Sequence, residues 1–266
     1  YRSTKNILDT ASNLISNNSN RVGKKLWSSA KQGDLVKLNC YRTGKEEAQG
    51  ISDIIEQKLK KKYSLNNISI LVRAIFQTRE FEERFLKIGI PYRIIGGIKF
   101  YERSEIKDCI AYLRVVYQNK DDLSFERIIN TPKRSIGETT VKQLNEYAKQ
   151  NGLSLEKSAI SLIQQNKIKP KTKLGLNSLL NLLAKWRNDL LNKKVGHIKL
   201  IQTILDESGY SQMLKDKKDL ENENRLENIK ELINAMKEYD NLESFLEHVA
   251  LATSLDQNWE DEKVNL

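Results

Sequence analysis

The residues with the most chemical potential lie between Pro132 and Thr140, where two adjacent cations precede a glycine and a segment of helical pattern. Lys133 and Arg134 supply positive charge, and Gly137 allows a backbone to come close to a ligand. The N–H groups that begin a helix are free to donate to an anion. Together they predict a site that holds one backbone phosphate without reading a base. On composition alone, an ordinary helix cap with solvated basic side chains is the simpler interpretation.

Two further cations stand at positions of interest. Arg2 lies at the start of the first helical segment, where it could pair bidentately with a phosphate or simply be solvated at a frayed terminus. Lys107 lies in a segment, 96–108, that packs aromatic and charged residues closely together. We expect charge pairs in this segment to fix the angle between two domains, and Lys107 could face a nucleic acid.

Several kinds of site are excluded by the residues that the sequence lacks. It has no glycine-rich loop followed by Lys-Ser or Lys-Thr and no Asp-Glu pair at a strand end, so nothing here binds Mg²⁺ and nucleotide unaided. Cys40 and Cys109 are too few for a disulfide framework or a cysteine-based zinc site, which indicates a reducing cytoplasm. His197 and His248 are isolated. No run of about 20 apolar residues is present, so we expect no membrane partner.

Charge is divided unevenly along the chain, which carries +10 over its 266 residues. Residues 206–266 hold seven basic and sixteen acidic side chains, so this segment carries −9 while residues 1–205 carry +19. A basic body with an acidic segment favours a polyanionic partner on one face. The alternative is compositional drift in a chain rich in Lys, Asn and Ile.

Residues 1–102 alternate between helical and strand-like patterns. Apolar residues recur at helical spacing in three segments, 1–16, 46–62 and 78–88, the last closed by Gly89. Short apolar runs predict three strands, 35–38, 68–72 and 91–95. This alternation indicates a parallel α/β sheet, and three strands make so thin a sheet that we expect part of a larger domain.

The strand patterns end after residue 102 and only helical patterns follow. The predicted helices are 105–117, 124–130, 139–150, 155–165, 174–192, 198–207, 222–239 and 242–251. They predict a second, all-helical domain of about 155 residues. Residues 263–266 have the pattern of a further strand. The expected fold class is therefore an α/β part followed by an all-α domain.

At several motifs the chain resembles the C-terminal part of UvrD/PcrA/Rep-type superfamily 1 DNA helicases. The run IPYRIIGG at 90–97, followed by FYER at 100–103 and EIKD at 105–108, is close to the family pattern. So is RIINTPKR at 127–134 before Ile136 and Gly137. Looser matches are YRST at 1–4, NR at 20–21, KLW at 25–27, LVR at 71–73, QTR at 77–79 with Glu82, SGY at 208–210 and RLEN at 225–228. The resemblance covers essentially the whole chain, most tightly residues 67–140.

The resemblance implies a division of the chain. Residues 1–102 would be part of the second RecA-like motor domain, called 2A, with an incomplete parallel sheet. Residues 103–258 would form the helical 2B domain inserted into it, and residues 259–266 would be the return strand toward 2A. A first motor domain with the phosphate-binding loop would lie upstream of Tyr1.

The resemblance also implies roles for single residues. Tyr1 would stack on the adenine of ATP, and Arg2 would contact the γ-phosphate and stabilise the transition state as an arginine finger. ATP and Mg²⁺ are the cofactors of the parent protein, and the chain alone is expected to bind neither. Arg73 would touch the single strand, and the loop at 135–137 would hold the duplex. The implied DNA-binding residues are Arg73, Lys107, Lys133, Arg134, Ser135, Ile136, Gly137, Thr139 and Thr140.

Two positions depart from the family pattern. Ile75 stands where the family usually has Asn, so the family's contact with single-stranded DNA is not carried over to this position. Ser135 replaces the first glycine of the usual Gly-Ile-Gly, and a side chain is costly where φ must be positive. The Ser135 hydroxyl could instead add a contact to the phosphate.

The sequence therefore predicts a fragment of an ATP-dependent 3′–5′ DNA helicase of the repair type, working in the cytoplasm and binding DNA independently of sequence. Two alternatives belong to other classes. One is a stand-alone DNA-binding module with a helix-hairpin-helix-like loop. The other is a protein-interaction scaffold that docks through the acidic segment 206–266.

Overall fold

The computed structural model describes residues 3–18, 27–192, 194–216, 219–255 and 263–266. Its contacts divide the chain into two compact units, Tyr1–Glu47 and Ala48–Leu266. The described residues are mostly helical, with one small parallel sheet. None of the helices in these ranges is both long and apolar enough to cross a lipid bilayer.

The first unit contains one complete helix, α1 (Lys5–Ser16), and an extended segment. The helix begins beside residues 31–33, where the Asn6 side chain donates to the carbonyl of Gly33 at 2.8 Å. None of its residues is buried. The predicted strand at 35–38 is wrong: Leu35 and Leu38 are 79% and 90% exposed, and no described strand pairs with this segment. An apolar run becomes a strand only where a neighbour supplies the ladder hydrogen bonds.

The sheet in the second unit joins two segments far apart in sequence. Strand β1 (Tyr92–Arg93) pairs in parallel with β2 (Val264–Asn265), with Tyr92 opposite Val264. The strand predicted at 68–72 is reduced to a single bridge between Ser69 and Asn265, and Leu71 is 97% exposed. The sheet is therefore smaller than the sequence predicts, and the predicted strand at the C-terminal end is confirmed.

Helices α2 (Gly44–Lys60) and α3 (Thr78–Ile88) accompany the sheet. Two short 3₁₀ turns, η1 (Leu65–Asn67) and η2 (Ile75–Gln77), lie between them. Helix α3 has the predicted bounds and ends at Gly89, whose φ of +72° suits the left-handed position after a helix. These elements share a small apolar core: Ala48, Ile55, Leu65, Phe81, Phe85, Ile90, Tyr92, Val264 and Leu266.

A run of helices follows the 3₁₀ turn η3 (Phe100–Glu102). They are α4 (Ser104–Tyr117), α5 (Asp122–Ile128), α6 (Glu138–Asn151), α7 (Leu155–Gln164), α8 (Pro170–Leu191), α9 (His197–Glu207), α10 (Tyr210–Lys215), α11 (Leu220–Met236) and α12 (Leu242–Leu255). Every helix predicted after residue 102 is present. Helix α10 was not predicted, because six residues are too few to show a helical period.

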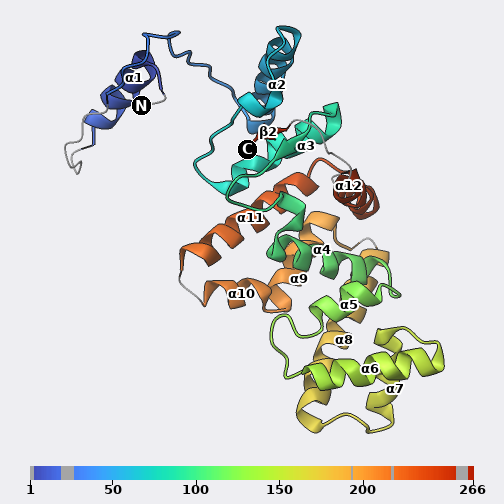
Figure 1. Cartoon of the computed structure of the whole chain (residues 1–266). Coiled ribbons are helices and arrows are strands. Elements are labelled where there is room, and N and C mark those ends of the chain that lie inside the picture. Colours follow the sequence, from blue (N-terminus) through green and yellow to red (C-terminus); the bar gives the residue numbers. More distant parts are fainter. Residues whose placement is uncertain (1–2, 19–26, 193, 217–218, 256–262) are drawn as a thin grey trace. The chain divides into compact units, whose positions relative to one another are not determined.

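Helix α4 is the centre of this helical region, and it contacts α5, α8, α9, α11 and α12 (Figure 1). Tyr112 on α4 is fully buried, and its ring meets those of Trp186 and Tyr210 edge to face, with centroids 6.1 and 6.4 Å apart. Because the apolar side of α4 is buried against several helices at once, the helical region has a single continuous core.

Candidate nucleic-acid interface

The loop at 133–137 connects α5 to α6, and a buried side chain and hydrogen bonds from Asn130 hold it in place. Ile136 is 1% exposed and belongs to the core of the helical region. The side-chain oxygen of Asn130 accepts from the backbone N–H groups of Arg134 at 2.7 Å and Ile136 at 3.3 Å. Ser135 has φ of +60°, so the positive φ considered at this position is present, whereas Gly137 has φ of −90°. The loop is therefore a fixed structure that carries a small strain at Ser135.

Arg134 does not extend into solvent as a free cation, which corrects the simple expectation from sequence. Its guanidinium turns back into the loop and donates to four acceptors, the carbonyl oxygens of Ile128 (2.8 Å), Ile129 (3.3 Å) and Pro132 (3.2 Å) and the hydroxyl of Tyr112 (2.6 Å). Donors that are occupied in this way are not available to a phosphate. Arg134 holds the loop together, and Lys133 is the exposed cation of the pair.

The charge of Arg134 is not neutralised by this arrangement. All four acceptors are uncharged, and no carboxylate in the described residues lies within ion-pair distance of Arg134 or Lys133. Burial raises the pKa of Tyr112, and the neighbouring Arg134 opposes that rise. The loop thus carries two positive charges, one fixed within it and one exposed on it.

Helix α8 also contacts the loop, and the sequence did not predict this contact. Thr172 donates from its hydroxyl to the carbonyl oxygen of Ser135 at 3.0 Å. A Cβ atom placed on Gly175 would lie 2.2 Å from the carbonyl oxygen of Arg134. Only glycine permits so close an approach, because real Cβ contacts are longer. The available signal was a single glycine within a leucine-rich helical pattern, which usually has a packing reason.

The outward face of the loop offers donors. The backbone N–H groups of Ser135, Gly137, Glu138 and Thr139 have no protein acceptor among the described residues. The side chains of Lys133, Ser135 and Thr139 are exposed, and Thr140 is half-buried. Lys107 is also exposed, on α4. Unused N–H groups and hydroxyls are the kinds of donor that hold an oxyanion, and residues 133–140 contain no Asn or Gln for a base edge.

Arg73, the predicted contact for single-stranded DNA, is exposed in another region of the second unit. The Gln77 side chain accepts from the backbone N–H groups of Arg73 (3.0 Å) and Ala74 (2.9 Å), which fixes the turn before α3. Ile75 is half-buried and lies against Gly97, on which a Cβ would be 2.2 Å from its Cδ1 atom. The departure from Asn at position 75 therefore gives an apolar contact within the protein.

A buried arginine, Arg103, ties this turn to the helical region. It is 4% exposed and donates to the carbonyl of Ile75 (3.1 Å), the hydroxyl of Thr78 (2.9 Å) and the side-chain oxygen of Asn228 on α11 (2.8 Å). The carboxylate of Glu82 lies 3.6 Å away. A predicted charge pair in the 96–108 segment is thus present with Glu82 on α3, while the partner on α11, Asn228, is neutral.

Burial dominates the electrostatics of this junction. It lowers the pKa of Arg103 and raises the pKa of Glu82, while hydrogen bonds from Thr78 and the Phe100 backbone N–H oppose the rise at Glu82. Asn228 continues the network by donating to Glu105 at 2.6 Å. Each buried polar group named here has a partner, which is the condition for such a network to stabilise the fold.

The structure brings together only some of the predicted site residues. Lys133, Ser135, Gly137 and Thr139 are exposed on the loop and the start of α6, whereas Ile136 is buried in the core and cannot contact DNA through its side chain. No hydrogen bond or ion pair among the described residues joins Arg73 or Lys107 to this loop. Tyr1 and Arg2 lie outside the described residues. Within the described ranges, no group of three His, Cys, Asp or Glu side chains could hold a metal ion.

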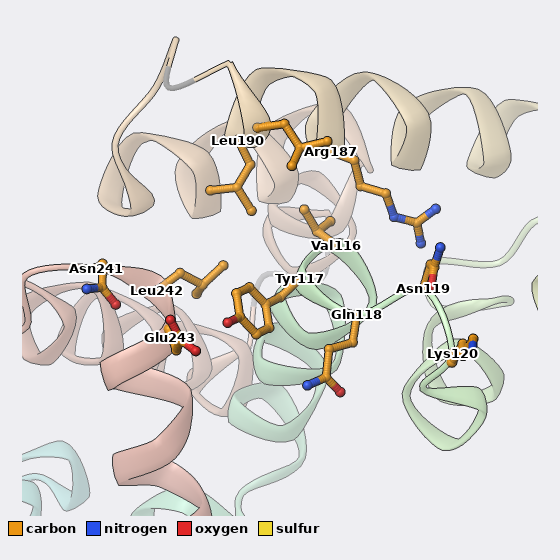
Figure 2. Close-up of a pocket in the computed structure, with 11 residues that line it drawn as sticks. Val116, Tyr117, Gln118, Asn119, Lys120, Arg187, Leu190, Asn241, Leu242 and Glu243 are labelled. Carbon is orange, nitrogen blue, oxygen red and sulfur yellow. The ribbon is translucent and has the colours of Figure 1, made fainter.

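A separate cavity of about 760 Å³ lies between the ends of α4 and α8 and the start of α12. Val116, Tyr117, Leu190 and Leu242 turn apolar groups toward it (Figure 2). Arg187 at its wall is already bound to the carboxylate of Glu156 and the carbonyl of Val115. The cavity is therefore mainly apolar and is not a second phosphate site.

Comparison with known proteins is consistent with this geometry. The family model of the UvrD-like helicase C-terminal domain matches residues 1–266. A probable DNA helicase II homolog from Rickettsia felis is 40% identical over 252 residues, which cover 94% of this chain and 38% of that protein. The ATP-dependent DNA helicase PcrA of Bacillus subtilis is 39% identical (97% and 35% covered), and DNA helicase II of Escherichia coli is 33% identical (98% and 38% covered). The chain spans a little more than a third of the length of these relatives. It belongs to the UvrD-like helicase C-terminal domain family.

Proposed function

We propose that this chain is part of an ATP-dependent DNA helicase that moves 3′ to 5′ on single-stranded DNA and unwinds the duplex ahead of it, in DNA repair in the cytoplasm. The relatives are named as DNA helicase II and as ATP-dependent PcrA, which supports helicase activity. The observation that carries the DNA contact is the exposed Lys133 beside unused N–H groups on a rigid loop. Such a surface binds backbone phosphate and is indifferent to base sequence.

The proposal divides the chain as the resemblance does. Residues 1–102 belong to motor domain 2A, residues 103–258 form the helical 2B domain, and residues 259–266 return to 2A. The parallel pairing of β2 with β1 supports this, because the chain rejoins the sheet of Tyr92 after the helices. The Arg103 network lies at the proposed boundary, so the two domains meet through buried polar contacts.

The nucleotide would be bound mainly by the rest of the helicase. In this proposal Tyr1 stacks on the adenine and Arg2 contacts the γ-phosphate, both outside the described residues. The described residues do not fit a Mg²⁺ site, since they contain no suitable cluster of ligands. We therefore assign no catalytic step to them, and their proposed task is to hold DNA.

The DNA contact is tested on this chain by fluorescence anisotropy with two duplexes of unrelated sequence over a salt series. Lys133→Ala is expected to weaken binding to both duplexes alike. The slope of log affinity against log salt should flatten by roughly one unit, because each cation that neutralises a phosphate contributes about that much.

The matched control is Lys215→Ala, which removes the same charge from an exposed position on α10. It should leave the slope unchanged. A wild-type slope for Lys133→Ala would show that the loop is a structural cap. If Lys133→Ala loses affinity for one duplex only, the loop recognises bases and does not simply bind backbone phosphate.

A further inference from the structure

A second group of cations lies against the same loop and has no role in the proposal so far. From the link between α7 and α8 into the first turn of α8 the chain reads Lys-Ile-Lys-Pro-Lys-Thr-Lys, so four lysines occur within residues 167–173. We call Lys167, Lys169, Lys171 and Lys173 the lysine turn. We infer that the lysine turn is a second contact for the phosphate backbone of duplex DNA, which extends the surface around Lys133 and rests on the function proposed for that loop.

The position of the lysine turn is fixed by contacts to the loop and to α6. Thr172, between Lys171 and Lys173, donates from its hydroxyl to the carbonyl oxygen of Ser135 in the loop at 3.0 Å. Gln143 on α6 donates from its side chain to the carbonyl oxygen of Lys167 at 3.2 Å. Ile168 is 6% exposed and anchors the turn in the core. The turn and the loop thus belong to the same rigid surface.

Lys171 is the lysine of the turn that shares a side of α8 with Gly175. It lies four residues before Gly175, so both project from the same side of α8. Gly175 touches the backbone of Arg134, as described above. We therefore expect a phosphate backbone that contacts Lys133 to reach Lys171 as well.

The lysines keep their positive charge free for a partner. Lys167, Lys169 and Lys171 are exposed, and no carboxylate within the described ranges forms an ion pair with any of the four. Lys173 donates to Asn166 at 2.8 Å, and that acceptor is neutral. Lys185, Lys230 and Arg225 differ in this respect, because each has a carboxylate partner. A cluster of unpaired cations of this kind attracts a polyanion.

The chemistry of the turn selects the phosphate backbone. Residues 167–173 contain no aromatic side chain for base stacking and no Asn or Gln for a base edge. A duplex carries one charge per about 1.7 Å of its axis, so several lysines in one short turn can each meet a phosphate. Binding at the turn is therefore expected to be sequence-independent and steeply dependent on salt.

The test compares two triple variants of this chain that lose the same charge. The first replaces Lys167, Lys169 and Lys171 with Gln. The control replaces Lys199, Lys215 and Lys237 with Gln, which are exposed on α9 and α10 and just after α11. In a salt series with duplex DNA, the first should flatten the slope by roughly two to three units, if each lysine neutralises about one phosphate. The control should change it by less than one unit.

The outcomes separate this inference from the function on which it rests. If Lys133→Ala flattens the slope and the lysine-turn variant behaves like its control, the loop binds DNA and the inference is wrong. If neither variant changes the slope, the proposed DNA surface itself is wrong. If the lysine-turn variant loses affinity for anionic lipid vesicles and none for the duplex, the partner of the turn is a membrane surface and the inference is again overturned.

Discussion

Among the described residues, the two arginines with the largest sets of side-chain hydrogen bonds, Arg103 and Arg134, work in opposite ways. Arg103 is 4% exposed and lies 3.6 Å from the carboxylate of Glu82, so its charge is neutralised inside the protein. Arg134 donates only to carbonyls and a hydroxyl, and its charge stays unneutralised at the surface loop. The first arrangement joins two regions of the fold. The second shapes a loop and leaves it positively charged, which suits a site for an anion.

Of the substitutions that test this comparison of Arg103 with Arg134, one at Arg103 should have the largest effect. Arg103→Met should lower the free energy of unfolding by about 3 to 5 kcal/mol, because it leaves Glu82 and Asn228 buried without their partner. Urea denaturation followed by circular dichroism measures this loss. The matched control is Arg127→Met, whose arginine is 37% exposed and pairs with Asp108, and which should lose less than about 1 kcal/mol. Equal losses would remove the distinction between a buried and a surface guanidinium.

Gly175→Ala should produce the next largest effect. It disturbs the loop of Arg134, because Gly175 lies against the Arg134 backbone. Alanine would favour the helix by about 1 kcal/mol at an unconstrained site. Here its Cβ would lie 2.2 Å from the carbonyl oxygen of Arg134, and overpacking of this kind costs about 1 to 3 kcal/mol. We expect lower stability and weaker duplex binding, measured by urea denaturation and fluorescence anisotropy.

Ser178→Ala serves as the control for Gly175→Ala, since Ser178 is an exposed residue of the same helix. Ser178→Ala should change neither the stability nor the affinity for duplex DNA. In addition, Gly175→Ala should weaken binding much less when Lys133 is already Ala, because both substitutions then act on one contact. Fully additive losses would mean that α8 does not act through the loop.

The buried pair of Arg103 and Glu82 also predicts that the stability of the fold depends on pH. Burial raises the pKa of Glu82 above 4.5, so the folded state holds this proton to higher pH than the unfolded state does. Stability contributed by the protonated form is therefore lost as pH rises from about 4.5 through the raised pKa. Glu82→Gln cannot titrate, so the free energy of unfolding of wild type relative to this variant should fall over that range. Parallel pH profiles for the two proteins would contradict the raised pKa.

The two regions also differ in how far they could be predicted from sequence. Helix α3 was predicted with its true bounds, because a helical period and the stop at Gly89 are local signals. The inward turn of Arg134 was not, since its acceptors depend on how the loop folds. The contact from Thr172 to Ser135 spans 37 residues and has no local signature. The strand at 35–38 failed for the same reason, because pairing is decided by residues outside the segment.

The smallest expected effect concerns the strained residue of the loop. Ser135 has φ of +60°, a conformation that costs an ordinary residue about 1 to 2 kcal/mol and glycine almost nothing. Ser135→Gly relieves this strain but makes the unfolded chain more flexible, which offsets about 0.4 to 1 kcal/mol. We therefore expect a net gain in stability of roughly 0.5 kcal/mol, seen as a small rise in the urea midpoint with an unchanged slope.

Ser135→Ala separates strain from a direct role of the hydroxyl, because it keeps the Cβ and removes the oxygen. The Ser135 side chain is exposed on the proposed phosphate-binding face and has no hydrogen-bond partner among the described residues. If the hydroxyl binds phosphate, Ser135→Gly and Ser135→Ala should weaken duplex binding by the same few-fold, although only the glycine variant gains stability. If the strain alone matters, the alanine variant should bind as wild type does. A loss of affinity confined to the glycine variant would instead indicate that the rigidity imposed by a side chain at this position aids binding.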